Sequence, residues 1–176
     1  IFVEYRWSDN AYTPYVGLEY FMATGDDRGS GDFEAWNPLF RSRTFGAIRD
    51  YLDVVYETAL TTDAGARGPI GGVNHHHVSV TGGLAPLDDL SLDATFYWFW
   101  VDEDLSYNTP PQLLDDEIGS ELDVNVTYDY TEDVTFGLGL AWFFPGDVYD
   151  DYAPGTGNGD VNDNATQVVS SVSVVF

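Results

Sequence analysis

The feature that most constrains the fold is a two-residue alternation in two adjacent segments, residues 118–130 and 134–144. The first segment, "IGSELDVNVTYDY", places mainly apolar side chains at even positions and polar or acidic ones between them. The second segment, "VTFGLGLAWFF", alternates large apolar residues with mainly small ones. Only an extended strand puts alternate residues on opposite faces. Strands of soluble domains have about five or six residues, whereas about 9–11 tilted residues cross a bilayer. The pattern predicts membrane-spanning strands.

Composition narrows the class of protein further. The 176 residues are enough for one domain or part of one, and the absence of cysteine excludes disulfides and thiolate metal sites. No uninterrupted apolar run of about 18 residues is present, which argues against transmembrane helices but not against transmembrane strands. The net charge of −24 repels nucleic acid. Such acidity is compatible with a high-salt habitat and equally with an acidic pore and loop surface.

The same alternation and the loop lengths predict a topology. The expected strands are 1–8, 12–24, 73–86, 89–102, 117–131, 133–144 and 165–176. Short turns alternate with long loops between them, as in barrels with periplasmic turns and extracellular loops. The predicted fold is an all-β, transmembrane, antiparallel up-and-down β-barrel with seven visible strands. Single-chain bacterial barrels have even strand numbers, and Ile1 begins in mid-pattern. We therefore expect the C-terminal part of a larger barrel.

Residues 25–72 are expected to form a single long extracellular loop at the barrel mouth. Apolar residues recur there at helical spacing from Phe45 to Ala59, which favours a short helix packed over or into the mouth. The alternative is an eight-stranded barrel in which "VVYETAL" is a further strand. The loop also carries the candidate constriction residues, Arg28, Arg41, Arg43, Arg49 and Arg67. Folded inward they would face an acidic wall; folded outward they would be ordinary loop arginines.

The face opposite the lipid should line the pore. The candidate pore-lining residues are Glu19, His75, His77, Asp93, Glu121, Asp123, Asn125 and Asp129, with Glu4 and Arg6 from the first segment. Rings of carboxylates favour cations, so the lumen is predicted to be cation-preferring. The alternative is that these carboxylates only hydrate the wall or pair with arginines of other strands.

Metal and catalytic sites are not predicted. Alternation places His75 and His77 inward and His76 outward, so the three imidazoles cannot converge on one ion. Polar lumen residues are the preferred interpretation of the two inward histidines, and a two-His site with Glu or Asp from a neighbouring strand is the alternative. No nucleophile and base are arranged for catalysis, so no enzyme activity and no cofactor are expected. The acidic loops at 24–32 and 157–164 allow weak Ca²⁺ binding, although ordinary solvated loops are the preferred interpretation.

Two longer stretches carry a family resemblance. They are "LEYFMATGDDRGSGDFEAWNPLF" and "IGSELDVNVTYDYTEDVTFGLGLAWFFPGD", with Thr24-Gly25-Asp26, Asn37-Pro38-Leu39-Phe40, the series Gly119, Glu121, Asp123, and Phe143-Phe144-Pro145-Gly146 as cues. Over residues 12–176 the chain resembles the C-terminal half of the alginate-export family of outer-membrane porins. The resemblance implies a monomeric barrel of many more strands that exports or admits small or polymeric solutes. A polyanion needs a basic lumen, and this chain is strongly acidic, so we do not infer from the resemblance that alginate is the transported substrate.

The resulting hypothesis is a passive channel in the bacterial outer membrane. Its expected partners are the lipid bilayer, small solutes or ions, and the barrel-assembly machinery, because Phe176 resembles the terminal aromatic assembly signal of such barrels. One alternative is a barrel that serves as a sheath or scaffold for a partner protein such as an electron carrier. Another is a secreted calcium-binding β-sandwich. Aromatic residues near both ends of the strands favour a barrel in a bilayer.

Overall fold

The computed structural model describes residues 1–25, 32, 34, 36, 45–48, 74–103, 106–107, 112–113, 115–152 and 163–176. Seven strands form one antiparallel sheet in the order β1-β2-β3-β4-β7-β8-β9. Their bounds are β1 Phe2–Arg6, β2 Tyr15–Ala23, β3 His75–Leu87, β4 Leu90–Trp100, β7 Glu117–Thr131, β8 Val134–Pro145 and β9 Ala165–Val174. The remaining elements are a two-stranded ladder of β5 (Ser106–Tyr107) and β6 (Gln112–Leu113), and the helix α2 (Asp147–Tyr152).

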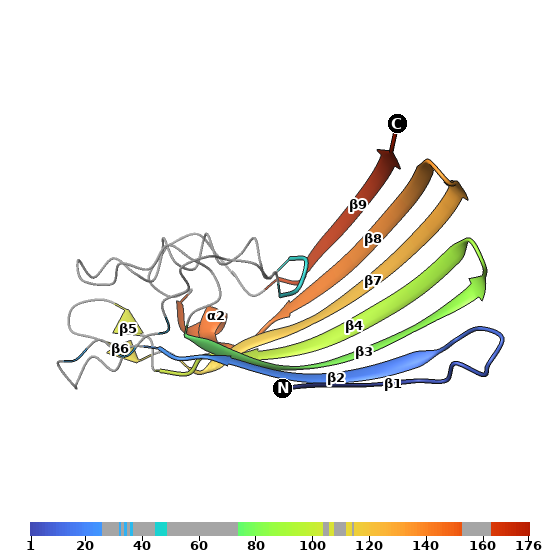
Figure 1. The fold of residues 1–176 in the computed structure, drawn as a ribbon. Coiled ribbons are helices and arrows are strands. Elements are labelled where there is room, and N and C mark those ends of the chain that lie inside the picture. Colours follow the sequence, from blue (N-terminus) through green and yellow to red (C-terminus); the bar gives the residue numbers. More distant parts are fainter. Residues whose placement is uncertain are drawn as a thin grey trace.

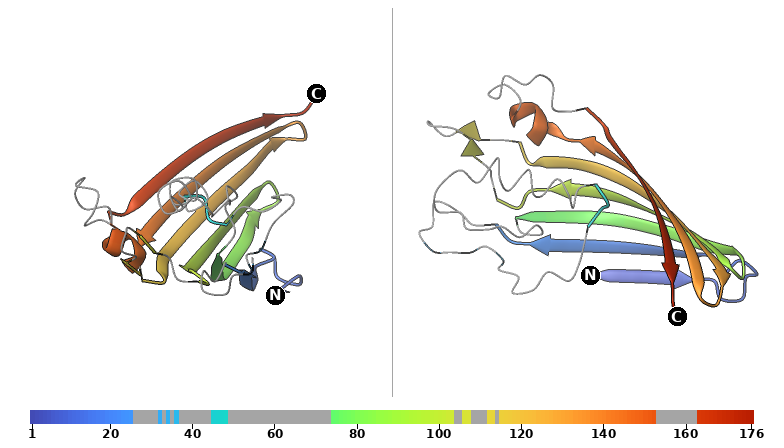
Figure 2. Two further views of the ribbon diagram at one scale, coloured as in Figure 1. Left: turned by 90° about the vertical axis from the view of Figure 1, so that its left-hand side faces the viewer. Right: turned by 90° about the horizontal axis from the view of Figure 1, so that it is seen from above.

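The predicted fold class is confirmed. Each strand of the large sheet pairs with the next of these strands along the chain, which is the up-and-down arrangement. The seven strands coincide with the seven predicted ones to within a few residues at their ends. The sheet is strongly curved and open, with β1 and β9 as its edges (Figures 1 and 2). An open, curved, antiparallel sheet is the form expected of part of a barrel.

The connections divide between the two ends of the sheet. The links β1–β2, β3–β4 and β7–β8 lie together at one end of the sheet, and β2, β4 and β8, which precede the long connections, end at the other (Figure 1). The end of the sheet at which β2, β4 and β8 finish is called the long-loop end. The alternation of short and long connections therefore agrees with the predicted topology. The small β5–β6 ladder and α2 were not predicted. The segment "VVYETAL" and the helical spacing beyond Ile48 lie outside the described residues.

The convex face of the sheet is apolar and exposed. Its exposed large side chains are Val3, Tyr5, Val16, Leu18, Tyr20, Met22, Val80, Leu84, Trp98, Tyr128, Phe136, Leu138, Phe144, Val168, Val172 and Val174. A contiguous apolar surface of this kind marks a contact with membrane or protein. None of the helices in the described part of the chain is both long and apolar enough to span a membrane.

One residue lies on the opposite face from the one expected. The even-numbered alternation placed Ile118 with the lipid-facing residues, but Ile118 is only 3% exposed and packs with the core residues of the concave face. The cause is a register shift between β4 and β7: Phe99 pairs with Gly119, and Trp100 pairs with Glu117. An extra residue in one strand reverses which side chains face inward beyond it. Gly119 has φ +132°, and a Cβ there would lie 2.3 Å from the carbonyl oxygen of Phe144.

The hydrophobic core lies on the concave face near the long-loop end. It consists of Phe45, Ile48, Phe99, Val101, Ile118, Ala141 and Phe143. Two of these residues come from the long connection between β2 and β3, so at least residues 45–48 of that connection are packed against the sheet. The core is therefore formed between the sheet and a segment folded onto its inner face.

Candidate functional site

The concave face is organised in rows that run across the strands. Because cross-strand partners share a face, the register places side chains of successive strands side by side. The first row contains Glu19, Ser79, Tyr97, Glu121, Phe143 and Ala165. The second, one step closer to the short turns, contains Gly17, Thr81, Thr95, Asp123, Ala141 and Gln167. The third contains Arg6, Tyr15, Gly83, Asp93, Asn125, Gly139 and Val169.

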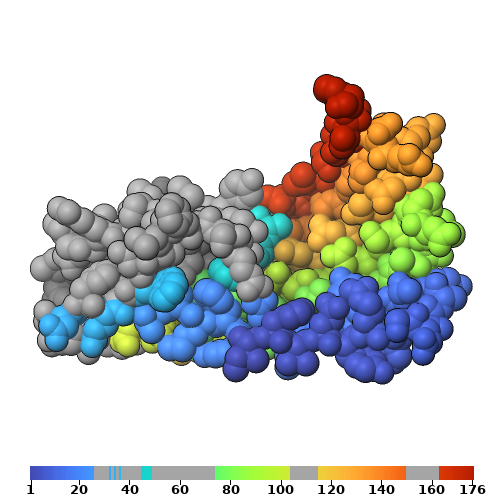
Figure 3. All heavy atoms as spheres, in the orientation of Figure 1, coloured from blue at the N-terminus to red at the C-terminus, as the bar shows by residue number. Residues whose placement is uncertain are grey.

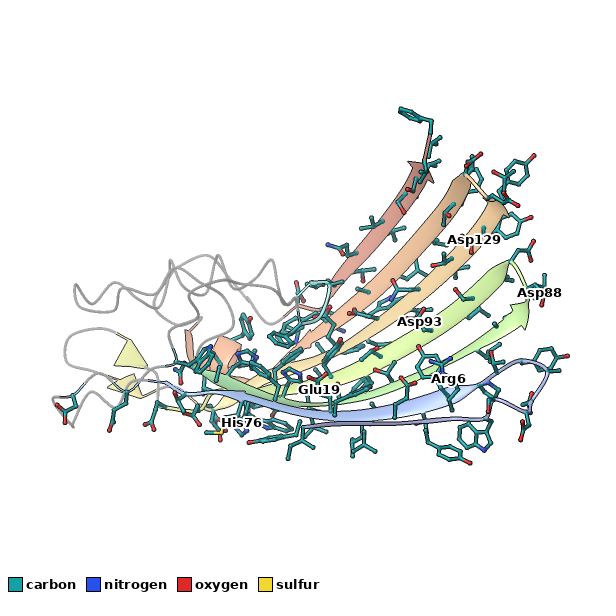
Figure 4. The ribbon with its side chains drawn as sticks, viewed as in Figure 1. Arg6, Glu19, His76, Asp88, Asp93 and Asp129 are labelled. Atoms are coloured by element: carbon teal, nitrogen blue, oxygen red, sulfur yellow. The ribbon has the colours of Figure 1, made fainter. Side chains whose placement is uncertain are left out.

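Five of the candidate pore-lining residues lie in these rows, namely Glu19, Asp93, Glu121, Asp123 and Asn125. His75 and His77 lie on the same face beyond the first row, and Asp129 lies on it beyond the third. Glu19, Asp93 and Asp129 project to the concave side, whereas His76 projects to the convex side (Figure 4). The candidates differ in exposure: Asn125 and Asp129 are exposed, Glu19 and Asp93 are half-buried, and His75, His77, Glu121 and Asp123 are buried. The sequence therefore placed them on a common face, and their role in lining a pore remains a prediction.

Two buried carboxylates hold residues 45–48 on this face. The backbone N–H of Ala47 donates to Oδ2 of Asp123 at 3.0 Å, and the N–H of Ile48 donates to Oε1 of Glu121 at 2.6 Å. Hydrogen bonds to ionised acceptors are shorter and about twice as strong as neutral ones. The space-filling view shows residues 45–48, in cyan, against the yellow and orange strands (Figure 3). The two carboxylates thus act as anchors for the folded-in segment.

Gly46 allows this close approach. Its φ of +77° lies in the left-handed region, and a Cβ at this position would lie 2.7 Å from Oε2 of Glu121. Glycine adopts such a conformation without the steric cost that other residues have. The sequence "FGAI" therefore presents two successive N–H groups to the carboxylates while keeping the backbone near them.

Phe45 covers the two inward histidines. Its ring centroid lies 4.4 Å from Phe21, 5.5 Å from His75 and 4.9 Å from His77. The imidazoles of His75 and His77 are nearly parallel, with centroids 5.6 Å apart, and both residues have 0% exposure. Both residues lie on the concave face, where their rings are covered by aromatic side chains and do not face water.

Metal binding is not supported by the described residues. They contain no group of three or more His, Cys, Asp and Glu side chains that could hold a metal ion. His76, on the opposite face, packs between Tyr20 and Trp100, with centroid distances of 6.3 and 5.6 Å. The three consecutive histidines are thus divided between the faces, as the alternation predicted.

The third row pairs a cation with an aromatic ring. Arg6 forms an ion pair with Glu4, with Nη2 and Oε1 3.1 Å apart, and its guanidinium lies 4.3 Å from the centre of the Tyr15 ring. A Cβ at Gly83 would be 2.4 Å from Cε1 of Tyr15, so the missing side chain makes room for this ring. Arg6 is the single Lys or Arg of the residues that the structure describes.

The polar part of the face is hollowed beside the anchored segment. A groove of about 470 Å³ lies between Ala47 and the concave side of β7, β8 and β9. Its floor is open where β8 carries Gly137, Gly139 and Ala141. The groove therefore follows directly from the small residues that alternate with large ones in "VTFGLGLAWFF".

Some predicted features fall outside the described residues. These are Arg28, Arg41, Arg43, Arg49 and Arg67, together with most of the acidic loops at 24–32 and 157–164. Phe176 is fully exposed, and its role in assembly remains a prediction. Sequence reasoning missed Gly46 and the backbone N–H groups of Ala47 and Ile48. The available signal was the glycine between apolar residues in "FGAI".

Comparison with known proteins identifies the family. The sequence profile described as "Alginate export" matches residues 1–161, which is most of the chain. No curated protein matches the sequence. The family is a transport family of outer-membrane porins and not a family of enzymes. The resemblance found in the sequence is thereby confirmed. The chain belongs to the alginate export family, which implies an outer-membrane export or porin-like function.

Proposed function

We propose that the protein is a porin-like channel of the bacterial outer membrane that passes small cations in preference to anions. The observation that carries this proposal is the charge of the concave face. Glu19, Asp93 and Asp129 retain exposed surface there. Arg6 is the single Lys or Arg in the described part, and it is already paired with Glu4. Carboxylates lining a confined aqueous path lower the local potential and enrich cations.

The anchored segment narrows the proposed passage. Residues 45–48 occupy space on the concave face near the long-loop end, and Glu121 and Asp123 bind their backbone. A segment at this position would limit the size of solutes without closing the polar groove below it. The arginines of the same loop, which lie outside the described residues, remain candidates for the constriction.

The inward position of residues 45–48 favours a channel over a sheath for a partner protein, because a sheath needs an unobstructed interior. A calcium-binding β-sandwich needs two sheets packed face to face. The described strands instead form one seven-stranded sheet and the small β5–β6 ladder. The polyanion alginate is a poor match for an acidic face, so small cations are the proposed solutes. The bilayer and, through Phe176, the barrel-assembly machinery are the proposed partners.

A bilayer recording tests the proposal. The purified protein is reconstituted in a planar lipid bilayer under a KCl gradient, and the reversal potential gives the ratio of K⁺ to Cl⁻ permeability. We expect a clear preference for K⁺ that decreases in Glu19→Gln and Asp129→Asn. The matched control is Asp88→Asn, which removes a carboxylate at the exposed β3–β4 turn. A reversal potential that indicates no preference, or a preference for Cl⁻, would refute cation selectivity.

A further inference from the structure

The groove beside Ala47 has the features of a binding site and not only of a passage. Its position is set by the second and third rows, where the side chains of β8 are smallest. The lining residues that bear on the inference are Ala47, Asp93, Asp123, Asn125, Gly139 and Gln167. Asp93 and Asn125 are cross-strand partners, and Asn125 is in turn the partner of Gly139. The side-chain oxygens of Asp93 on β4 and of Asp123 and Asn125 on β7 therefore lie next to the part of β8 that has no large side chains.

The acceptors of the groove are only partly used by the protein. Asp123 is 9% exposed, and its Oδ2 accepts the N–H of Ala47. Its Oδ1 is buried, and the Asp123 carboxyl group also shares a side-chain hydrogen bond with Glu121. Asp93 shares a hydrogen bond with Asn125 but is only half-buried in the lining of the groove. Because a carboxylate has about four lone-pair sites, Asp93 can accept further hydrogen bonds from a ligand. None of the residues lining the groove is Lys, Arg or His.

The size and lining of the groove indicate the class of ligand. Its volume of about 470 Å³ is far larger than a bare metal ion, since one water corresponds to about 30 Å³ of liquid. No cluster of metal-ligating side chains occurs in the described segments. Apolar surface is also present, because Ala47, Ala141 and Val169 line the same space. Carboxylates combined with an apolar wall suit a molecule that has both a charged donor and a short hydrocarbon body.

We propose that this groove binds a small organic cation, namely a protonated primary amine on a short aliphatic chain. The ammonium group donates to the carboxylates of Asp93 and Asp123, and the methylene groups lie along Ala141, Val169 and the bare backbone of Gly139. The inference rests on the proposed cation-selective channel, for which it names a class of solute. It is also testable apart from conduction, because binding and permeation are measured separately.

Calorimetry on the detergent-solubilised protein provides the test, with 1,4-diaminobutane as the probe at fixed ionic strength. We expect saturable binding that becomes roughly tenfold weaker or more in Asp93→Asn, as expected when a charged hydrogen-bond acceptor is lost. Gly139→Val, which fills the floor without changing the charge, should also weaken binding. Asp88→Asn is the matched charge control and should bind as the unmodified protein does. The uncharged analogue 1,4-butanediol should produce no binding heat.

The outcomes separate this inference from the proposed function. A protein that shows K⁺ preference in the bilayer but does not bind the diamine overturns the inference alone. Binding that is equal in Asp93→Asn and Asp88→Asn, or equal for the diol and the diamine, overturns it as well. Diamine binding that is lost in Asp93→Asn supports the groove as a site even if the reversal potential shows no cation preference, in which case the channel proposal fails.

Discussion

The backbone N–H of Ile48 donates a hydrogen bond of 2.6 Å to Oε1 of Glu121, although 73 positions separate the two residues in the chain. Glu121 has no exposed surface, and the adjacent inward carboxylate, Asp123, binds the N–H of Ala47. This pair of contacts connects β7 to residues 45–48 of the connection between β2 and β3. The width of the proposed passage therefore depends on whether these contacts are kept.

Removal of the Glu121 carboxylate should release the anchored segment. A hydrogen bond to a charged group contributes about 1.5–3 kcal/mol, so we expect Glu121→Ala to lower the thermal stability and to raise the single-channel conductance. Glu121→Gln keeps an oxygen acceptor and should have a smaller effect. Glu132→Gln, at the exposed β7–β8 turn, is the control. If conductance is the same in Glu121→Ala and Glu132→Gln, the carboxylate does not hold the segment across the passage.

Gly46→Ala should disturb the same contact through the backbone. The left-handed conformation at φ +77° costs a residue with a Cβ about 1–2 kcal/mol. The new methyl group would also meet Oε2 of Glu121 at 2.7 Å. Gly82→Ala is the matched control, because a Cβ there has the carbonyl oxygen of Tyr15 as its nearest neighbour, at 3.7 Å. We expect increased protease cleavage in the loop of Gly46→Ala only. Equal cleavage of both variants would argue against a conformational requirement at Gly46.

Phe45→Ala should expose the buried histidines. Phe45 is 5% exposed and its ring packs on Phe21, His75 and His77. Truncating a buried phenylalanine costs about 3–5 kcal/mol. The imidazoles should then react with diethyl pyrocarbonate faster than in the unmodified protein. Trp36→Ala is the control from the same loop, because Trp36 is 57% exposed. Unchanged reactivity in Phe45→Ala would mean that other groups cover the histidines.

The strands and their faces could be predicted from the sequence because the period-two pattern is local. Glu19, Asp93, Glu121 and Asp129 were assigned to one face from alternation alone, without knowledge of their neighbours. Ile118 was assigned wrongly because a bulge at Gly119 shifts the register. The bulge depends on the pairing between β4 and β7, which is not visible in either strand separately.

The burial of the site could not be predicted in this way. Alternation gives the direction of a side chain but not what covers it. His77 and Asn125 both point to the concave side, yet His77 is fully buried and Asn125 is exposed. The difference comes from residues 45–48, which lie far away in sequence and approach only one end of the face. The small residues Gly137 and Gly139 were visible in the sequence, but the groove requires Ala47 as its opposite wall.

The assignment of the convex face to lipid gives a prediction about charge tolerance. Val124 and Asn125 are neighbours near the middle of β7 and lie on the convex and concave faces. An arginine on the lipid side of a barrel at the bilayer midplane costs about 2–4 kcal/mol, whereas lumenal substitutions mainly affect selectivity. Val124→Arg should therefore lower the free energy of unfolding by roughly that amount in lipid vesicles, measured by urea titration. Asn125→Arg should lower the free energy of unfolding much less, because the new guanidinium would lie on the concave face beside its cross-strand partner Asp93, with which it can form an ion pair. Equal losses in the two variants would contradict a lipid-covered convex face and, with it, the proposed channel.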